Sequence, residues 1–360
     1  MPSRARLSTP SSLARPQPRR LVLLRASAPA ARACYSSEAN PGPLVRVTDL
    51  PAPNTGHIRI LELNRPSARN AISRSLLAAL RAEVDAVHAQ YDAATGDELP
   101  RPGRFGGAAG ADEKGPTRAL VLASAVDTCF CAGADLKERK GFSAEETSAF
   151  LTTLRTTLTS LSALPIPTIS AVGSVALGGG LELALATHFR VLSSNAVVGL
   201  PETRLGIIPG AGGTYRLPAL IGIGRARDLV VTGRRVSAAE AYFLGLADRL
   251  VEILPEEEEE EGAEGQQSPP KKKGEGGGMT REQAEKMLGR ARRDVLSEAV
   301  RLAGEICEGG PVAVRAALRA VEEPREEMEN LMYERVLGTE DRDEALRAFA
   351  EKRTPVFKGR

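Results

Sequence analysis

Two glutamates, Glu182 and Glu202, are the residues of this sequence best suited to chemistry. Each lies beside glycine in a small apolar segment, Leu177–Ala184 and Gly199–Glu202. Ionised carboxylates are seldom fully buried unless they are paired. Two carboxylates that meet in one dry pocket can act as general acid and base, because burial moves their pKa values toward the working range. The alternative is that both lie at the surface, at the ends of a helix and a strand.

A glycine run, Gly178-Gly179-Gly180, stands between an expected strand and an expected helix. Free N–H groups at such a helix start, together with the helix dipole, form a site for negative charge. Phosphate is one candidate ligand, but the sequence lacks both a Gly-x-x-x-x-Gly-Lys-Ser/Thr motif and a dinucleotide-type Gly-x-Gly-x-x-Gly. A developing oxyanion is the other candidate, with a second N–H supplied by the bend Cys131–Asp135. Each motif alone is weak, since a tight turn would also account for it.

The elements that must position these residues alternate between strands and helices. Short apolar runs predict strands, and apolar residues at steps of three and four predict helices. The run 143–164 also begins with a capping box, Ser143 with Glu146, and ends before Pro165. This order predicts an α/β fold with a buried parallel sheet. The predicted strands are 57–64, 118–123, 168–175, 189–192 and 197–199, and the predicted helices are 70–91, 143–164, one opening at 181–186, and one beginning at 212–221.

Composition is that of a globular enzyme, with 42% hydrophobic and 26% charged residues and no long apolar run. The four cysteines are too few for a disulfide framework, and only three histidines are present, none near Cys129-Phe130-Cys131. A metal site is therefore not expected, and buried thiols in a reducing compartment are the favoured interpretation.

The first 37 residues differ from the rest of the chain. They hold seven arginines and no acid before Glu38, which is typical of a mitochondrial transit peptide. A secretory signal fits less well, because the apolar stretch Leu21–Leu24 has only four residues. Removal of this leader changes the net charge from 48 − 46 = +2 to 41 − 46 = −5. A mildly acidic mature protein is a poor candidate for binding nucleic acid.

Two further segments interrupt the expected fold. Residues 96–116 are rich in Gly and Pro and are predicted to be a flexible insertion. Residues 255–278 contain six consecutive glutamates and a lysine run, and are predicted to be a disordered low-complexity insertion. The predicted organisation is thus a leader (1–37), a core (45–254), this insertion (255–278) and a helical oligomerisation part (279–360), with a break at Gly309-Gly310-Pro311.

Taken together, the motifs resemble those of the enoyl-CoA hydratase/isomerase (crotonase) superfamily. The similarity runs from about residue 45 to the end, with a closer match to the mitochondrial methylglutaconyl-CoA hydratases at Ala132–Arg139, Leu177–Ala186 and the chain end. It implies an α/β, crotonase-like spiral of ββα units with a C-terminal helical subdomain. The matching segments are Asn64-Arg65-Pro66 with Asn70-Ala71, Phe130–Glu138, Ala176–Ala184, and Pro201-Glu202 through Gly206–Thr214.

The resemblance assigns roles to particular residues. It implies an oxyanion hole at the N–H groups of Ala132 and Gly179, with Glu182 activating water and Glu202 protonating C2, although the two roles could be coupled or exchanged. Retention of both glutamates favours hydration over double-bond migration. The implied substrate and CoA contacts are Ala68, Gly133, Ala134, Asp135, Lys137, Gly210 in the acyl pocket, and Phe357 and Lys358 toward the CoA of a neighbouring subunit. For Asp135 and Lys137, a helix cap and a solvated charge are the alternatives.

No cofactor is expected, because coenzyme A is part of the substrate. The expected partners are an acyl-CoA and further copies of the chain, as a homotrimer or a dimer of trimers in the mitochondrial matrix. A general short-chain enoyl-CoA hydratase and an enoyl-CoA isomerase remain alternatives. RNA binding is less favoured: one relative uses lysines on its first helix, where this chain has Arg74, Ala78 and Ala82. A methylglutaconyl group would need a basic partner for its second carboxylate, and the sequence does not identify that partner.

Overall fold

The computed structural model describes residues 42–100, 114–254 and 279–360. The predicted leader (1–37) and the predicted disordered insertion (255–278) lie outside the described residues, as does the centre of the 96–116 loop. Residues Pro41–Arg360 form one unit. Two sheets and the helices around them build this unit, and their arrangement determines where the glutamates lie.

Six strands form the larger sheet, in the order β1-β2-β3-β5-β7-β10. β1 and β2 are antiparallel, and the later neighbours pair in parallel. β3 and β5 are buried along their whole length, which is why their sequences are continuous apolar runs rather than alternating ones. The strands are β1 Val45–Pro51, β2 His57–Leu63, β3 Thr117–Ser124, β5 Thr168–Val172, β7 Phe189–Ser193 and β10 Arg249–Val251.

Four short strands form a second sheet, in the order β4-β6-β8-β9. β4, β6 and β8 are parallel, and β9 is antiparallel to β8. The chain passes from the larger sheet to the smaller one three times, from β3 to β4, from β5 to β6 and from β7 to β8, and helical structure follows each time. This repeat confirms the predicted spiral of ββα units. The strands are β4 Cys129–Cys131, β6 Val175–Leu177, β8 Val197–Gly199 and β9 Arg235–Ser237.

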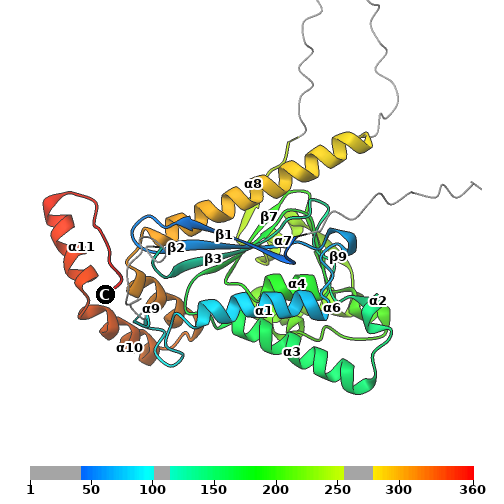
Figure 1. The fold of residues 1–360 in the computed structure, drawn as a ribbon, viewed down its shortest axis with the longest axis horizontal. Helices are drawn as coiled ribbons and strands as arrows, with labels where there is room; N and C mark the ends of the chain where they lie inside the picture. Colours follow the sequence, from blue (N-terminus) through cyan, green and yellow to red (C-terminus); the bar gives the residue numbers. More distant parts are fainter. Residues whose placement is uncertain (1–41, 101–113, 255–278) are drawn as a thin grey trace, which may run out of the picture. The chain divides into compact units, whose positions relative to one another are not determined.

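Helices cover both faces of the larger sheet (Figure 1). On one face, α8 (Arg281–Cys307) buries an apolar stripe that includes Val295 and Ala299 against strand residues such as Val121 and Ile169. On the other face lie α1 (Arg74–His88), α3 (Ala144–Ser162) and α4 (Gly179–Leu185), within the main core. The remaining helices are η1 Pro66–Ala68, α2 Leu136–Arg139, η2 Pro201–Leu205, α5 Gly213–Ile221, α6 Ile223–Thr232, α7 Ala238–Leu244, α9 Pro311–Glu322, α10 Glu326–Leu337 and α11 Glu340–Glu351.

The helix ends largely follow the capping signals in the sequence. The Ser143 hydroxyl accepts from the Glu146 N–H and the Glu146 carboxylate accepts from the Ser143 N–H, so the predicted capping box is confirmed. α1 is shorter than its predicted range because Ser73 caps it and accepts from the Leu76 N–H. The predicted break at 309–311 is also confirmed, since α8 ends at Cys307 and α9 begins at Pro311.

One predicted strand was wrong, and the sequence analysis missed β1, β4, β9 and β10. The predicted strand 168–175 is two strands, β5 and β6, which belong to different sheets. The turn between them contains Gly173, where an added methyl group would lie 2.8 Å from the Arg292 Cα of α8, so this bend is tightly covered. β4 was not predicted at all, because a three-residue strand carries no measurable periodicity.

The described ends of the 96–116 loop are anchored, whereas the sequence predicted a flexible segment throughout. Glu98 pairs with Arg118 of β3 and with Arg315 of α9, the latter at 2.8 Å. On the other side of the loop, the Gly115 carbonyl oxygen lies 3.1 Å from Nδ1 of His57. The edges of the insertion thus contact the body of the protein, and its flexibility stays a prediction.

Candidate active site

Three segments meet at one edge of the smaller sheet. The parallel strands β4, β6 and β8 are neighbours, and ligands of such sheets bind beyond the carboxyl ends of their strands. The segments that follow these strands are Ala132–Asp135, Gly178–Gly180 and Leu200–Glu202. The chain therefore brings both predicted glutamates and both predicted N–H segments to the same place.

Glu182 lies in the first turn of α4 and is only 2% exposed. Its Oε1 accepts two hydrogen bonds, from the Ala211 N–H at 2.7 Å and from the Gly213 N–H at 2.9 Å. Burial raises the pKa of Glu182, while these two N–H groups and the charges of Arg216 and Arg155 act in the opposite direction. Burial is the largest effect and leaves the pKa of Glu182 above its usual value, while the fixed donors and cations partly offset it in favour of the ionised form.

Glu202 lies in η2 and is 9% exposed. Its Oε2 is buried and has no hydrogen-bond partner among the residues that the structure describes. Burial raises the pKa of Glu202 to about 7, and the neighbouring charge of Glu182 adds to this increase. Near neutral pH the pair can therefore hold one proton, which suits acid and base chemistry.

The glycine run allows this close packing. Gly178 has a φ of +54°, and an added methyl group would lie 2.9 Å from Glu202 Oε1. At Gly180 the methyl group would lie 2.1 Å from the Cys131 carbonyl oxygen. Only glycine lets the start of α4 approach both β4 and the second glutamate this closely.

The prediction that Ala132 supplies an oxyanion N–H was wrong. That N–H already donates to the Arg69 carbonyl oxygen at 3.1 Å. Ala134 lies opposite Ile72 in a parallel bridge. The Ile72 N–H donates to the Gly133 carbonyl oxygen, and the Asp135 N–H donates to the Ile72 carbonyl oxygen. The Ala134 N–H therefore points away from Ile72. The Ala134 nitrogen lies 3.4 Å from the position of a methyl group added to Gly179, so these two residues lie next to each other.

Several residues predicted to contact CoA lie next to this edge. Ala68 is half-buried in η1, and this turn is held by Asn70, whose Nδ2 donates to the Ser124 hydroxyl at 2.9 Å and the Phe130 carbonyl oxygen at 3.0 Å. Gly133 follows β4 with a φ of +91°. Lys137 is exposed at the start of α2. Their contacts with CoA stay predictions.

Asp135 has a clear structural role. It caps α2, accepting from the N–H groups of Lys137 and Glu138, and it forms an ion pair with Arg65 at 2.7 Å. Burial raises the pKa of Asp135, but the Arg65 hydrogen bond and the two N–H groups outweigh burial and leave the pKa below its usual value. The helix-cap interpretation is confirmed, and this carboxylate holds the Ala132–Asp135 bend in place.

Gly210 lies beside the glutamates, whereas Phe357 and Lys358 do not lie there in the same chain. The Gly210 carbonyl oxygen accepts from Arg155 of α3 at 2.6 Å, and the next residue is a donor to Glu182. The Phe357 N–H donates to Asn54 at 3.4 Å, and the Lys358 N–H donates to Asp341 of α11 at 2.6 Å. Their role toward a neighbouring subunit stays a prediction.

Sequence reasoning missed four residues that surround Glu182. Ala211 and Gly213 donate to its carboxylate, and Arg155 and Arg216 lie close enough to act on its charge. The signal for the first two was the Gly210-Ala211-Gly212-Gly213 run, whose glycines expose backbone N–H groups. Arg155 carries no local signal, because it is one polar residue in a long amphipathic helix.

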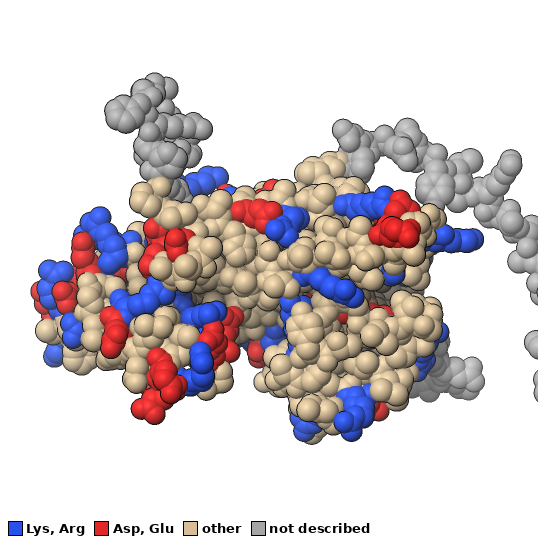
Figure 2. Space-filling view, turned by 90° about the horizontal axis from the view of Figure 1, so that it is seen from below, with Lys and Arg blue, Asp and Glu red and all other residues tan. Residues whose placement is uncertain are grey.

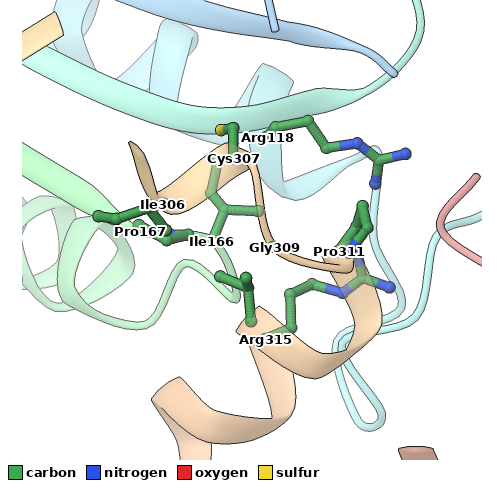
Figure 3. Close-up of a pocket in the computed structure, with 9 residues that line it drawn as sticks. Arg118, Ile166, Pro167, Ile306, Cys307, Gly309, Pro311 and Arg315 are labelled. Atoms are coloured by element: carbon green, nitrogen blue, oxygen red, sulfur yellow. The ribbon is translucent and has the colours of Figure 1, made fainter. Parts of the chain in front are cut away.

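Among the described residues, cavities also lie away from this edge, and two of them border α9. One has a volume of about 10 Å³, which is room for one water molecule, and Figure 3 shows Arg118 and Arg315 extending beside it. The other, of about 570 Å³, lies at the His88 end of α1, among α9 and α10. Neither glutamate lines this cavity.

The described residues contain no group of three or more His, Cys, Asp or Glu side chains that could hold a metal ion. No described helix is both long enough and apolar enough to cross a bilayer. In Figure 2, acidic and basic side chains lie next to one another at the left end, where the C-terminal helices lie. Ion pairs such as Arg353 with Glu344 account for this mixture, which does not form a basic patch there.

Comparison with known proteins agrees with these features. Residues 110–263 match the family described as enoyl-CoA hydratase/isomerase. The chain is 66% identical over 329 residues to methylglutaconyl-CoA hydratase 1, mitochondrial, of Pyricularia oryzae (91% of this chain, 90% of that protein). It is 54% identical over 318 residues to an enoyl-CoA isomerase/hydratase of Zymoseptoria tritici (88% of each). The crystal structure of an enoyl-CoA hydratase from Bacillus anthracis superposes with a TM-score of 0.66 at 34% identity, covering 88% of this chain and all of that one.

Proposed function

The chain belongs to the enoyl-CoA hydratase/isomerase family, and on that premise we propose that its two buried glutamates add water across the 2,3 double bond of 3-methylglutaconyl-CoA. The observation that carries the proposal is the difference in hydrogen bonding and burial between Glu182 and Glu202 at the sheet edge. Glu182 accepts two backbone N–H groups, while Glu202 has an unpartnered buried oxygen and a pKa of about 7. Such a pair can supply a base and an acid at the same pH.

The thioester carbonyl oxygen binds between the N–H groups of Ala134 and Gly179. Gly179 is the first residue of α4, so its N–H lacks an intrahelical acceptor and the helix dipole adds to its effect. Hydrogen bonds to the carbonyl draw electrons from C3 and stabilise the negative charge that develops on the oxygen. The loss of one such donor typically costs about 3 kcal/mol of transition-state stabilisation.

The two glutamates have different roles in the addition of water. Glu182, whose ionised form is supported by two N–H groups, accepts a proton from the water as its oxygen attacks C3. Glu202, whose raised pKa keeps a proton on it near pH 7, donates that proton to C2. The result is a 3-hydroxyacyl thioester, and the original protonation states return by proton exchange with solvent.

The substrate and the location follow from similarity. The Pyricularia oryzae relative is named a methylglutaconyl-CoA hydratase and mitochondrial, at 66% identity over nine-tenths of the chain. We therefore place this protein in the mitochondrion, and in its matrix if residues 1–37 act as a cleaved leader. Isomerase activity is the second candidate, because the Zymoseptoria tritici relative carries both activities in its name.

RNA is not part of the proposal. Of the three positions considered on α1, only Arg74 is charged, and its guanidinium already pairs with Glu146 at 3.0 Å and lies 4.1 Å from the centre of the Phe142 ring. An arginine in these two contacts is a weak phosphate ligand.

The oligomerisation of the C-terminal helices, and the approach of Phe357 and Lys358 to another subunit's CoA, stand as proposals.

The test follows the loss of the conjugated enoyl-thioester absorbance with crotonyl-CoA and 3-methylglutaconyl-CoA. The panel includes Glu182→Gln, Glu202→Gln and, as a matched control, Glu252→Gln at an exposed position. We expect preferred hydration of 3-methylglutaconyl-CoA, lost in the first two variants and kept in the third. Hydration of crotonyl-CoA alone would assign a general short-chain hydratase. No hydration of either by folded protein would refute the two-glutamate mechanism and favour the isomerase.

A further inference from the structure

We propose that Arg155 binds a carboxylate at the far end of the acyl group, so that the site selects enoyl-CoA thioesters whose acyl chain ends in an acid. This inference rests on the proposed function and names the residue that sets its specificity. It concerns an arginine on α3 that transfers no proton in the proposed reaction.

Arg155 is tied to the catalytic segment by a short path of contacts. Its Nε donates to the Gly210 carbonyl oxygen at 2.6 Å, and the next residue, Ala211, donates to Glu182 at 2.7 Å. One helical turn before Arg155, the Leu151 side chain lies 3.4 Å from where a methyl group on Gly210 would be. The α3 side chains that contact Gly210 are therefore one apolar residue, Leu151, and one cation, Arg155.

The outer end of the Arg155 guanidinium is available. The Nε contact is the hydrogen bond that the structure gives it, and no carboxylate in the described ranges lies within 4.0 Å of it. By contrast, Arg74, the first residue of α1, forms an ion pair with Glu146 of α3. A guanidinium held at Nε presents its two remaining nitrogens as a fork, which matches the two oxygens of a carboxylate.

The neighbouring cation is not available in this way. Arg216 donates to the Ala211 carbonyl oxygen at 3.0 Å and to the Ser162 hydroxyl at 3.3 Å, and it lies 4.9 Å from the centre of the Tyr215 ring. Both arginines contact the segment that donates to Glu182, Arg155 at Gly210 and Arg216 at Ala211, and their charges oppose the increase in the pKa of Glu182 that burial causes. Of the two, Arg155 is the one whose two terminal nitrogens both lack a hydrogen-bond partner among the described residues.

The test uses the full chain and compares two pairs of thioesters. One pair reacts, 3-methylglutaconyl-CoA and crotonyl-CoA, and the other is saturated and cannot be hydrated, glutaryl-CoA and butyryl-CoA. In each pair only the first member has a terminal carboxylate. The variants are Arg155→Gln, Arg155→Lys and a matched control, Arg227→Gln, which removes an exposed arginine from α6.

We expect Arg155→Gln to lower the ratio of kcat/KM values, diacid over monoacid, by about 10- to 100-fold, the usual effect of losing a hydrogen bond to a charged group. The ratio of dissociation constants for glutaryl-CoA and butyryl-CoA should change in the same direction, with Arg155→Lys intermediate and Arg227→Gln like the wild type. The binding ratio remains informative if a variant loses turnover.

Unchanged ratios in Arg155→Gln, with a wild-type protein that hydrates both substrates, would overturn the role of Arg155 and leave the hydratase intact. Equal losses in Arg155→Gln and Arg227→Gln would overturn it as well. A folded wild-type protein that neither hydrates nor binds any of the four thioesters would overturn the proposed function, and this inference with it.

Discussion

Replacement of Glu202 by glutamine should stabilise the protein at alkaline pH while it abolishes hydration. The folded protein holds the proton of this carboxyl more tightly than the unfolded chain does, because its pKa rises from 4.5 to about 7. The stabilising contribution is therefore complete below pH 4.5 and is lost as the pH rises through about 7. The difference between these two pKa values corresponds to at most about 3.4 kcal/mol, and solvent screening reduces this value.

Glutamine does not ionise, so Glu202→Gln removes the pH-dependent part. The free energies of unfolding of the wild type and the variant should be measured by chemical denaturation at pH 5 and pH 8, with Glu252→Gln as control. We expect the variant to gain at least about 1 kcal/mol relative to the wild type between these two pH values. Any fixed cost of burying the amide cancels in that comparison. If the difference between variant and wild type is the same at both pH values, the argument from burial is wrong.

Three further predictions test the donors, the packing and the thiols. Gly179→Pro removes the N–H at the first position of α4, where proline fits, and should lower kcat about 100- to 1000-fold with little change in the circular dichroism spectrum; an unchanged kcat would exclude this N–H as a donor. Gly180→Ala forces a methyl group to 2.1 Å from the Cys131 carbonyl oxygen and should lower the free energy of unfolding by about 1–3 kcal/mol, while Gly224→Ala, with open space around it, should not. Burial raises the pKa of Cys129 and Cys307 to about 11 and that of Cys131 to about 12, so a Cys34→Ser chain should show no thiol reaction with Ellman's reagent at pH 8 until it is unfolded.

The sequence predicted long elements well and short ones poorly. The helix at 143–164 and the strand at 118–123 have a periodicity, a cap or a continuous apolar run, and the structure has α3 and β3 in those places. β4 and β6 have three residues each, so neither contains a full repeat of any pattern. The active-site edge is built from these short strands, so the sequence located its residues without showing how they converge.

The error at Ala132 has the same origin. A motif identifies a bend, but which N–H of the bend is free depends on the partners of its neighbours. The Ala132 N–H donates to the carbonyl oxygen of Arg69, a residue far from β4 in the sequence. The bridge between Ala134 and Ile72 leaves the Ala134 N–H pointing away from Ile72. Arg155 shows the same limit, because its significance depends on a contact with Gly210, 55 residues later.

The unequal surroundings of the two glutamates make Glu202 the cleaner probe of the mechanism. Glu182 holds the Ala211–Gly213 turn through two hydrogen bonds, so its replacement changes both a reacting group and the loop beside Arg155. Glu202 has an oxygen that no described group satisfies, so its carboxylate contributes little to packing and is retained at a cost in stability. Burial, hydrogen bonds and neighbouring charges act differently on the two carboxyl groups, and this difference separates the proton donor from the base. The structure therefore predicts that losing Glu202 costs activity and improves stability, whereas losing Glu182 costs both.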